Sequence, residues 1–199
     1  AVSKTKPVSD LQEAYDAGQR AFGENKVQEL VDKAEVLPKD IHWHLIGHLQ
    51  TNKVKYIAPF VHLIHAVDSL KLLVEINKQA EKNERSIDVL LQFHIAQEET
   101  KFGLSLEEAQ ELIESDAFQS CQNIHVVGVM GMASFVDDEQ QVHREFQSLK
   151  RIFDQLKASQ FKDNTYFKEI SMGMSGDYQI AIEEGSTMIR VGSSIFGGR

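Results

Sequence analysis

A lysine close to the beginning of the chain stands where a Schiff-base lysine is expected. Residues 1–4 (AVSK) have the pattern of a short strand, and Pro7 forces a turn three residues after Lys4. A rigid strand would hold the Lys4 amine at the rim of the space that the strand lines. The alternative is a solvated lysine at a strand end, because lysine is seldom fully buried unless it is paired.

Two segments rich in glycine and serine are candidates for binding phosphate. The run SMGMSGD (171–177) passes from an apolar stretch through small residues into a helical pattern, so backbone N–H groups, serine hydroxyls and a helix N-terminus can converge on an anion. The run VGSS (191–194) offers a second set of amides. Either run alone is more often an ordinary turn, but together, after the last two strands of a barrel, they indicate a phosphate site.

Arg190 adjoins the second of these segments. It precedes Gly192 by two residues in an extended run, so both positions face the same side of a sheet, which in a barrel is the interior. A buried arginine needs a partner. The partner is either a carboxylate such as Asp68 or Glu24 in an internal ion pair, or an acceptor atom of a ligand.

Strand and helix patterns alternate along the whole chain and must position these groups. We predict strands at residues 1–4, 20–25, 42–47, 63–67, 89–95, 124–132, 167–172 and 188–195. We predict helices between Pro7 and Gly18, from Ser105 onward, and at residues 27–36, 51–57, 69–83, 138–158 and 177–184.

Strict alternation of this kind predicts a parallel sheet with right-handed crossovers, and eight strands favour a closed (β/α)8 TIM barrel over an open sheet. The prediction is a single domain over residues 1–199, with the eighth helix missing from this chain. Functional groups in such a barrel lie at the carboxyl ends of the strands. These ends carry Lys4, Asn25, His44, Asp68, His94, Met130, Ser171 to Ser175 and Arg190 to Ser194.

Composition narrows the class of protein. The 199 residues are 42% hydrophobic and 26% charged, which suits a globular domain with a real core. A net charge of −9 without a basic run argues against binding nucleic acid, and no apolar stretch is long enough to span a membrane. A single cysteine, Cys121, forms neither an internal disulfide nor a cysteine metal cluster, so we expect a cytoplasmic protein without a metal. The chain begins without methionine, so a targeting signal could have preceded it.

A reactive lysine, a phosphate site and an inward arginine together suggest pyridoxal 5′-phosphate. The lysine would form an imine with the aldehyde, the two loops would hold the phosphate, and the arginine would face the ring nitrogen. The lysine, the arginine and the two loops would then line one pocket.

Seven ordered motifs carry a family resemblance that covers essentially the whole chain. They are AVSKTKP, FGENKVQE, HWHLIGHLQTNK, ETKFGL, GVMGMA, SMGMSGD and IRVGSSIFG. The chain resembles the YggS/PROSC family of pyridoxal phosphate homeostasis proteins, which have the fold type III barrel of the N-terminal domain of alanine racemase. Members usually carry a further N-terminal helix, which would be the helix missing here.

The resemblance implies roles for seven residues. Lys4 would carry the cofactor, Arg190 would face the pyridine nitrogen, and Ser175, Gly192 and Ser193 would hold the phosphate. Two further residues match family positions near the ring and phosphate: Asn25 and Ser171.

Other candidate residues have plainer interpretations. Lys6 would face the same side of the strand as Lys4, but it adjoins Pro7, so we do not expect it to bind the cofactor directly. It could receive the cofactor during transfer. His44 either stacks near the ring or is a core histidine, and the core is favoured. Three residues are expected to be structural: Met130 and Met132 as barrel filling and Cys121 as an inert thiol.

Three functions compete at this point. The first is a monomeric carrier of pyridoxal phosphate that supplies apo enzymes and has no catalytic residue of its own. The second is an amino-acid racemase, which is disfavoured because the chain ends just after its eighth strand, without the second domain that supplies the opposing tyrosine in the racemases that it resembles. The third is an empty barrel that acts through protein contacts, which a failure to bind the cofactor would favour.

Overall fold

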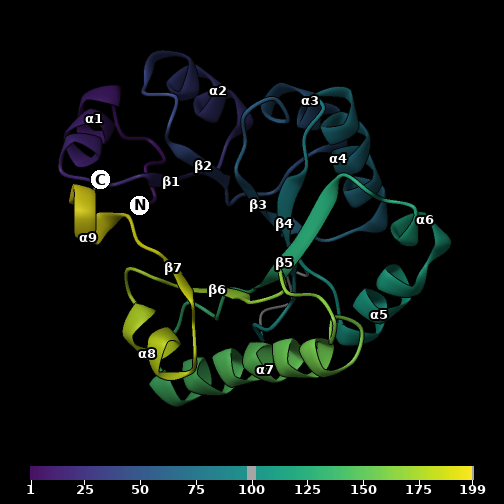
Figure 1. Ribbon diagram of the computed structural model, residues 1–199. Coiled ribbons are helices and arrows are strands. Elements are labelled where there is room, and N and C mark those ends of the chain that lie inside the picture. The colour runs from purple at the N-terminus through teal and green to yellow at the C-terminus, as the bar shows by residue number, and fades with distance from the viewer. Residues whose placement is uncertain (98–101, 199) are drawn as a thin grey trace.

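The computed structural model describes residues 1–97 and 102–198. Within this part of the chain, seven parallel strands form one sheet in the order of the sequence, and helices surround it (Figure 1). The strands are β1 (Ala21–Glu24), β2 (His42–Leu45), β3 (Leu63–Val67), β4 (Ile87–Gln92), β5 (Ile124–Met130), β6 (Glu169–Met174) and β7 (Met188–Arg190). The predicted parallel α/β barrel is confirmed.

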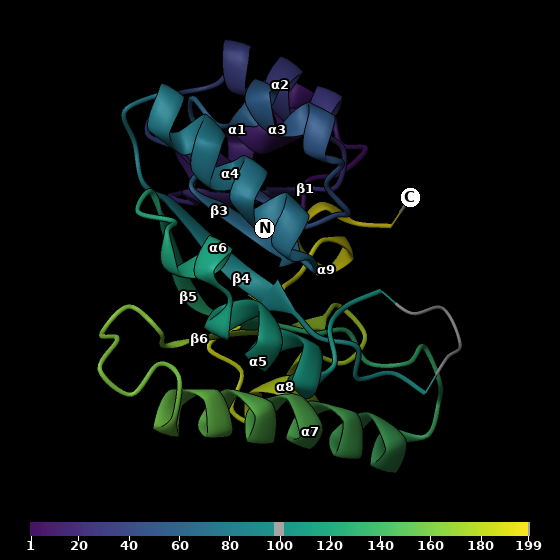
Figure 2. The same ribbon diagram turned by 90° about the vertical axis from the view of Figure 1, so that its right-hand side faces the viewer.

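The helices lie outside the strands, with the long α7 against β5 and β6 (Figure 2). They are α1 (Val8–Asp16), α2 (Val27–Val36), η1 (Thr51–Lys53), α3 (Val54–Ile57), α4 (Leu70–Lys82), α5 (Leu106–Glu114), α6 (Asp116–Gln119), α7 (Glu139–Ala158), α8 (Tyr178–Glu183) and α9 (Ser193–Phe196). Ser105 and Glu108 form the predicted capping box of α5. No helix in the described part of the chain is long and apolar enough to cross a membrane.

The first three residues close the barrel between β1 and the segment after β7. Val2 forms a parallel bridge with Gly23 of β1, where the Gly23 N–H donates to the Ala1 carbonyl and the Ser3 N–H to the Gly23 carbonyl. On its other side, the Val2 N–H donates to the Val191 carbonyl at 2.7 Å. Residues 1–3 therefore occupy the place of the predicted first strand, and the N-terminus lies between β1 and β7 in Figure 1.

Two predicted strands end three or more residues earlier than expected. The strand predicted at 89–95 ends at Gln92, because the chain then leaves the sheet through a bridge between Phe93 and Leu104. The strand predicted at 188–195 ends at Arg190, and residues 193–196 form α9, in which Ile195 and Phe196 donate to the Gly192 carbonyl. A short apolar run does not distinguish a strand from a helical turn. Residues 99–101 of the ETKFGL motif lie outside the described residues.

The core has two parts, which follow the two faces of the sheet. The larger part packs between the strands and the helices and includes Phe22, Trp43 and Phe146. The smaller part comes from the opposite face of β3, β4 and β5 and fills the barrel interior with Leu63, Ala66, Leu90, Val127 and Met130. The interior side chains therefore support the floor of the space at the carboxyl ends of the strands.

Gly128 gives the first testable prediction. It pairs with Glu169 of β6, and a Cβ at this position would overlap the Glu169 carbonyl group. We expect Gly128→Ala to lower the free energy of unfolding by about 3 kcal/mol, because two hydrogen-bonded strands must separate. Urea denaturation measures this change. As a control, Gly176→Ala, whose Cβ would meet no atom within 4 Å, should change it by less than about 1 kcal/mol. Equal effects would contradict the prediction.

Candidate functional site

A cavity of about 590 Å³ opens at the carboxyl ends of the strands. Its wall is built from the segments that follow the barrel strands, which is where a parallel barrel gathers functional groups. Six of the seven residues predicted to bind a cofactor line it: Lys4, Asn25, Ser175, Arg190, Gly192 and Ser193. The fold therefore brings together side chains from both ends of the chain.

Lys4 lies in a turn that directly follows the barrel-closing residues. The turn is closed by a hydrogen bond of 3.1 Å from the Lys6 N–H to the Ser3 carbonyl. Thr5 has a φ of 64°, in the left-handed region that a β-branched residue rarely adopts. The Lys4 side chain lines the cavity and is only partly exposed. The amine is thus presented by a tightly defined backbone.

Arg190, at the end of β7, is 7% exposed and lines the cavity. Its Nη1 donates to Ser171 Oγ at 2.7 Å and its Nη2 to the Gly131 carbonyl at 3.0 Å. Neither Asp68 nor Glu24 bonds to it, so the ion-pair interpretation is wrong within the described residues. Burial lowers the pKa of Arg190 to about 10, which leaves it charged at neutral pH. A guanidinium has five N–H donors, so donors remain for an acceptor in the cavity.

The two glycine–serine segments meet at one side of the cavity. The Gly192 N–H donates to Ser175 Oγ at 3.1 Å, which joins the segment after β6 to the segment after β7. A Cβ at Gly192 would lie 2.8 Å from the Val2 carbonyl oxygen, so this close approach requires glycine. The N–H groups of Gly176 and Ser193 donate to no acceptor among the described residues. These amides and the Ser175 hydroxyl form a cradle for an anion.

Ser171 differs from the expectation that it lies near the cofactor. It is fully buried and is not part of the cavity wall, because its position on β6 points into the barrel below the site. Its hydroxyl instead accepts from Arg190 and contacts His65 Nδ1 at 2.9 Å, and His65 Nε2 lies 3.0 Å from His44 Nδ1. Ser171 therefore supports Arg190 from behind.

The two histidines behind Ser171, His65 and His44, are neutral at neutral pH. Burial, and then the neighbouring His62, lower the pKa of His44 to about 3, and burial lowers the pKa of His65 well below its ordinary value. Ser171 accepts a hydrogen bond from Arg190, so its own proton is free to donate to His65 Nδ1. His65 then carries its proton on Nε2 and donates to His44 Nδ1. His44 is thus a buried barrel residue, as the core interpretation expected.

Lys6 lines the cavity next to the C-terminal segment. Its Nζ donates to the Phe196 carbonyl at 2.9 Å and to the Gly197 and Gly198 carbonyls at 3.3 Å. Three carbonyl partners fix the ammonium group and tie the C-terminal segment to the turn that carries Lys4.

Three other residues were expected to be structural. Met130 is buried in the interior cluster and also forms part of the cavity wall. Met132 is 40% exposed at the rim, so its assignment as barrel filling is wrong: it follows the end of β5 and has left the interior. Cys121 is outside the wall, and partial burial raises the pKa of its thiol.

Sequence reasoning missed part of the site. Gln92 lines the cavity because β4 ends there, three residues earlier than predicted. His65 was passed over although it is a polar residue within the apolar strand 63–67, which is a usable signal for a buried hydrogen bond. His48 and Phe102 also line the cavity; both lie in runs that carry the family resemblance, HWHLIGHLQTNK and ETKFGL, but no chemical role was expected of either residue.

The barrel belongs to the same fold class as the N-terminal domain of alanine racemase. The family model described as the N-terminal domain of alanine racemase matches residues 2–199. A solved alanine racemase of Clostridium difficile 630 superposes with a TM-score of 0.81, covering 100% of this chain and 54% of that chain. Its sequence identity is 14%, so this likeness shows the fold alone.

Nearer relatives share one name. The pyridoxal phosphate homeostasis protein of Aquifex aeolicus is 41% identical over 198 residues, 99% of this chain and 85% of the relative. The Homo sapiens protein of the same name is 40% identical over 211 residues, 100% of this chain and 75% of the relative. The structure of PipY from Synechococcus elongatus PCC7942 with PLP bound is 34% identical, with a TM-score of 0.87, and covers 99% of this chain and 91% of that chain. The chain belongs to the family of pyridoxal phosphate homeostasis proteins.

The buried histidines give a prediction about pH. Their folded-state pKa values lie below the ordinary value of 6.5, so below pH 6.5 the unfolded chain binds protons that the native protein does not. We expect the free energy of unfolding to fall with pH below about 6.5, by about 1.4 kcal/mol per pH unit for each histidine. Urea denaturation between pH 7 and pH 4 measures this slope.

Two variants test whether His44 contributes to the pH dependence of the free energy of unfolding. In His44→Gln the amide oxygen can still accept from His65, so the protein should fold and lose one of the two contributions. The same substitution at His48, which is exposed and does not contact Ser171, His65 or His44, serves as the control for the change of residue type. An unaltered slope in His44→Gln would show that His44 is not the titrating group.

Proposed function

We propose that this protein binds pyridoxal 5′-phosphate through a covalent bond to Lys4. The observation that carries the proposal is that one cavity collects Lys4, Arg190 and the cradle formed by Ser175, Gly192 and Ser193. The Lys4 amine would add to the aldehyde carbon, and water would leave as the imine forms. The bound cofactor supplies an electrophilic imine carbon conjugated to a pyridine ring.

The residues present fit this cofactor in charge and in donor type. Arg190 keeps N–H donors for the ring nitrogen, which is an acceptor when it is unprotonated. The Gly176 and Ser193 amides and the Ser175 hydroxyl suit phosphate oxygens. The ammonium group of Lys6 adds positive charge at the cavity edge, so a phosphate enters a locally cationic site on an acidic protein.

We further propose that the protein holds the cofactor and passes it to enzymes that need it, without a reaction of its own. The names of the relatives support a homeostatic role. A charged Arg190 facing the ring nitrogen would disfavour protonation of that nitrogen, and an unprotonated ring stabilises a carbanion poorly. Transfer requires only that the imine bond can be broken again. The condensation of an amine with an aldehyde is reversible, so this requirement is met.

The covalent bond is testable by reduction. Purified protein mixed with pyridoxal 5′-phosphate should show the visible absorption of a protonated imine, and borohydride should fix the label on the peptide that contains Lys4. Lys4→Ala should lose the reducible label because the nucleophile is gone, whereas Lys6→Ala should keep it. Peptide mass mapping gives the position. Full reducible binding by Lys4→Ala would refute the assignment.

The absence of a dedicated reaction is tested by α-proton exchange. The cofactor-loaded protein should exchange the α-proton of alanine in deuterated water far more slowly than about 1 s⁻¹, a rate typical of slow enzymes. In parallel, it should activate a cofactor-free aminotransferase. Free pyridoxal phosphate at the same concentration is the control for both assays. Exchange with inversion of alanine at about 1 s⁻¹ or faster would favour a racemase instead.

A further inference from the structure

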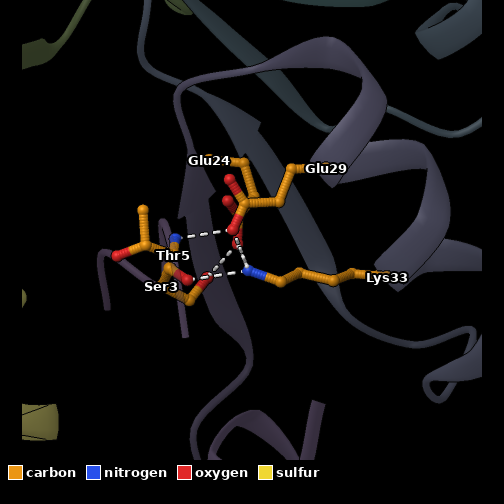
Figure 3. A network of polar contacts seen from close by, with 5 residues as sticks. All are labelled: Ser3, Thr5, Glu24, Glu29 and Lys33. Atoms are coloured by element: carbon orange, nitrogen blue, oxygen red, sulfur yellow. Dashed lines mark hydrogen bonds and ion pairs between the residues drawn. The ribbon is translucent and has the colours of Figure 1, made fainter. Parts of the chain in front are cut away.

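A buried ionic cluster lies between β1 and α2 and contacts Ser3 and Thr5, the two neighbours of Lys4 in the sequence (Figure 3). Lys33 Nζ donates to Glu24 Oε1 at 2.6 Å, to Glu29 Oε1 at 2.7 Å and to the Ser3 carbonyl at 2.7 Å. Glu24 is fully buried and Lys33 is 5% exposed. None of these three charged side chains lines the cavity. We call Glu24, Glu29 and Lys33 the Lys33 network.

The Lys33 network holds the residues on both sides of Lys4. Ser3 is fixed twice, because its carbonyl accepts from Lys33 and its hydroxyl donates to Glu24 Oε1 at 2.6 Å. Thr5 is fixed by its N–H, which donates to Glu29 Oε1 at 2.6 Å. Figure 3 shows these contacts converging on the Lys33 ammonium group and the Glu29 carboxylate. The backbone of Lys4 is therefore clamped before and after the residue.

The backbone that the network holds is strained. Thr5 is one of two residues other than glycine with a positive φ in the described chain, and its φ of 64° lies in the left-handed region. Such a conformation costs about 1–3 kcal/mol in a β-branched residue and persists only where the surroundings fix it. The Glu29 carboxylate supplies this fixation through the Thr5 N–H. The conformation places Lys4 at the tip of the turn between Ser3 and Lys6.

Stability alone does not explain the Lys33 network. Glu24 Oε2 is buried without a hydrogen-bond partner among the described residues, which costs about 1–3 kcal/mol for a polar group. Burial raises the pKa of Glu24 although Lys33 and Ser3 donate to its other oxygen. Apolar side chains of similar volume often stabilise a protein as well as a buried ion cluster or better. Apolar side chains would not form the hydrogen bonds that fix Ser3 and Thr5.

We propose that Glu24, Glu29 and Lys33 are positioning residues that fix the Lys4 amine for attack on the aldehyde of its ligand. The inference rests on the proposed function. The side chains of the Lys33 network bond to Ser3 and Thr5, and none of its three residues lines the cavity. Weakening it should therefore reduce formation of the covalent bond more than it reduces non-covalent binding in the same cavity.

Two probes separate these effects in the 199-residue protein. Pyridoxal 5′-phosphate carries the aldehyde, and its bond to Lys4 is counted after borohydride reduction. Pyridoxine 5′-phosphate carries an alcohol in place of the aldehyde, so it reports only on the cradle and Arg190. A third readout needs no ligand: hydrogen exchange of the peptide that contains the Thr5 amide.

The central variant is Glu29→Ala, which should fold because the Glu29 side chain is partly exposed and alanine suits a helix. We expect about tenfold less reducible imine at Lys4 and faster exchange at Thr5, because the strained turn loses its acceptor. Binding of pyridoxine 5′-phosphate should change less than about twofold. Glu29→Gln retains an acceptor oxygen and should recover most of the imine.

A second variant tests the Lys33 network at another position, and a third variant, at Arg85, is the control. Lys33→Met removes the shared cation and should repeat the selective loss of imine. Arg85 is a matched control, because it donates to the Ala58 and Val61 carbonyls without contacting the Lys4 turn. Arg85→Met should lower the thermal stability and leave imine formation unchanged.

Three results would overturn the inference: normal imine formation in folded Glu29→Ala, equal losses with both probes, or no recovery in Glu29→Gln. Failure of the unsubstituted protein to form a reducible bond at Lys4 would instead refute the proposed function. The two failures are therefore distinguishable.

Discussion

Closure of the barrel by its first three residues is the constraint on which the site depends. Val2 pairs with Gly23 on one side and donates to Val191 on the other, so the two ends of the chain share one seam. This seam places Lys4 next to the loop after β7, nearly the whole length of the chain away in sequence. Gly192 permits this closeness, since any side chain there would meet the Val2 carbonyl. Without the seam, the lysine and the anion cradle would not face one cavity.

Two buried polar systems flank the cavity and differ in charge. Inside the barrel, Arg190 donates to the neutral acceptors Ser171 and Gly131, and neutral histidines lie behind Ser171, so no carboxylate is bonded to its guanidinium among the described residues. Outside the strands, the Lys33 network pairs its charges internally. A buried charge is costly without a partner. Of these two systems, the Lys33 network contains its own carboxylates, whereas Arg190 has no carboxylate bonded to it in the described part of the chain.

The separation of Arg190 inside the barrel from the Lys33 network outside the strands suits the proposed function, in which a cofactor is bound and later released. Under the proposed function, non-covalent contacts from the cradle and Arg190 would supply affinity that does not depend on the covalent bond, while the clamped lysine would supply a bond that is reversible. Preorganising an amine saves the entropy of ordering it when the bond forms. Strain at Thr5 is consistent with such a role, because strained backbone collects where geometry serves function.

Local patterns in the sequence determined most of the fold and the residues of the site. Strand and helix periodicities, with caps such as Ser105, set the alternation that builds the barrel, and strand ends identified Lys4, Arg190 and the two glycine–serine loops. The tertiary structure decided what local spacing does not encode: which side chains approach across strands. In the folded protein, Arg190 donates to Ser171 and not to a carboxylate, and Lys33 forms an ion pair with Glu24. Residues 193–196, predicted as part of a strand, form a helix. These outcomes depend on distances between segments remote in sequence, and only the closed barrel fixes those distances.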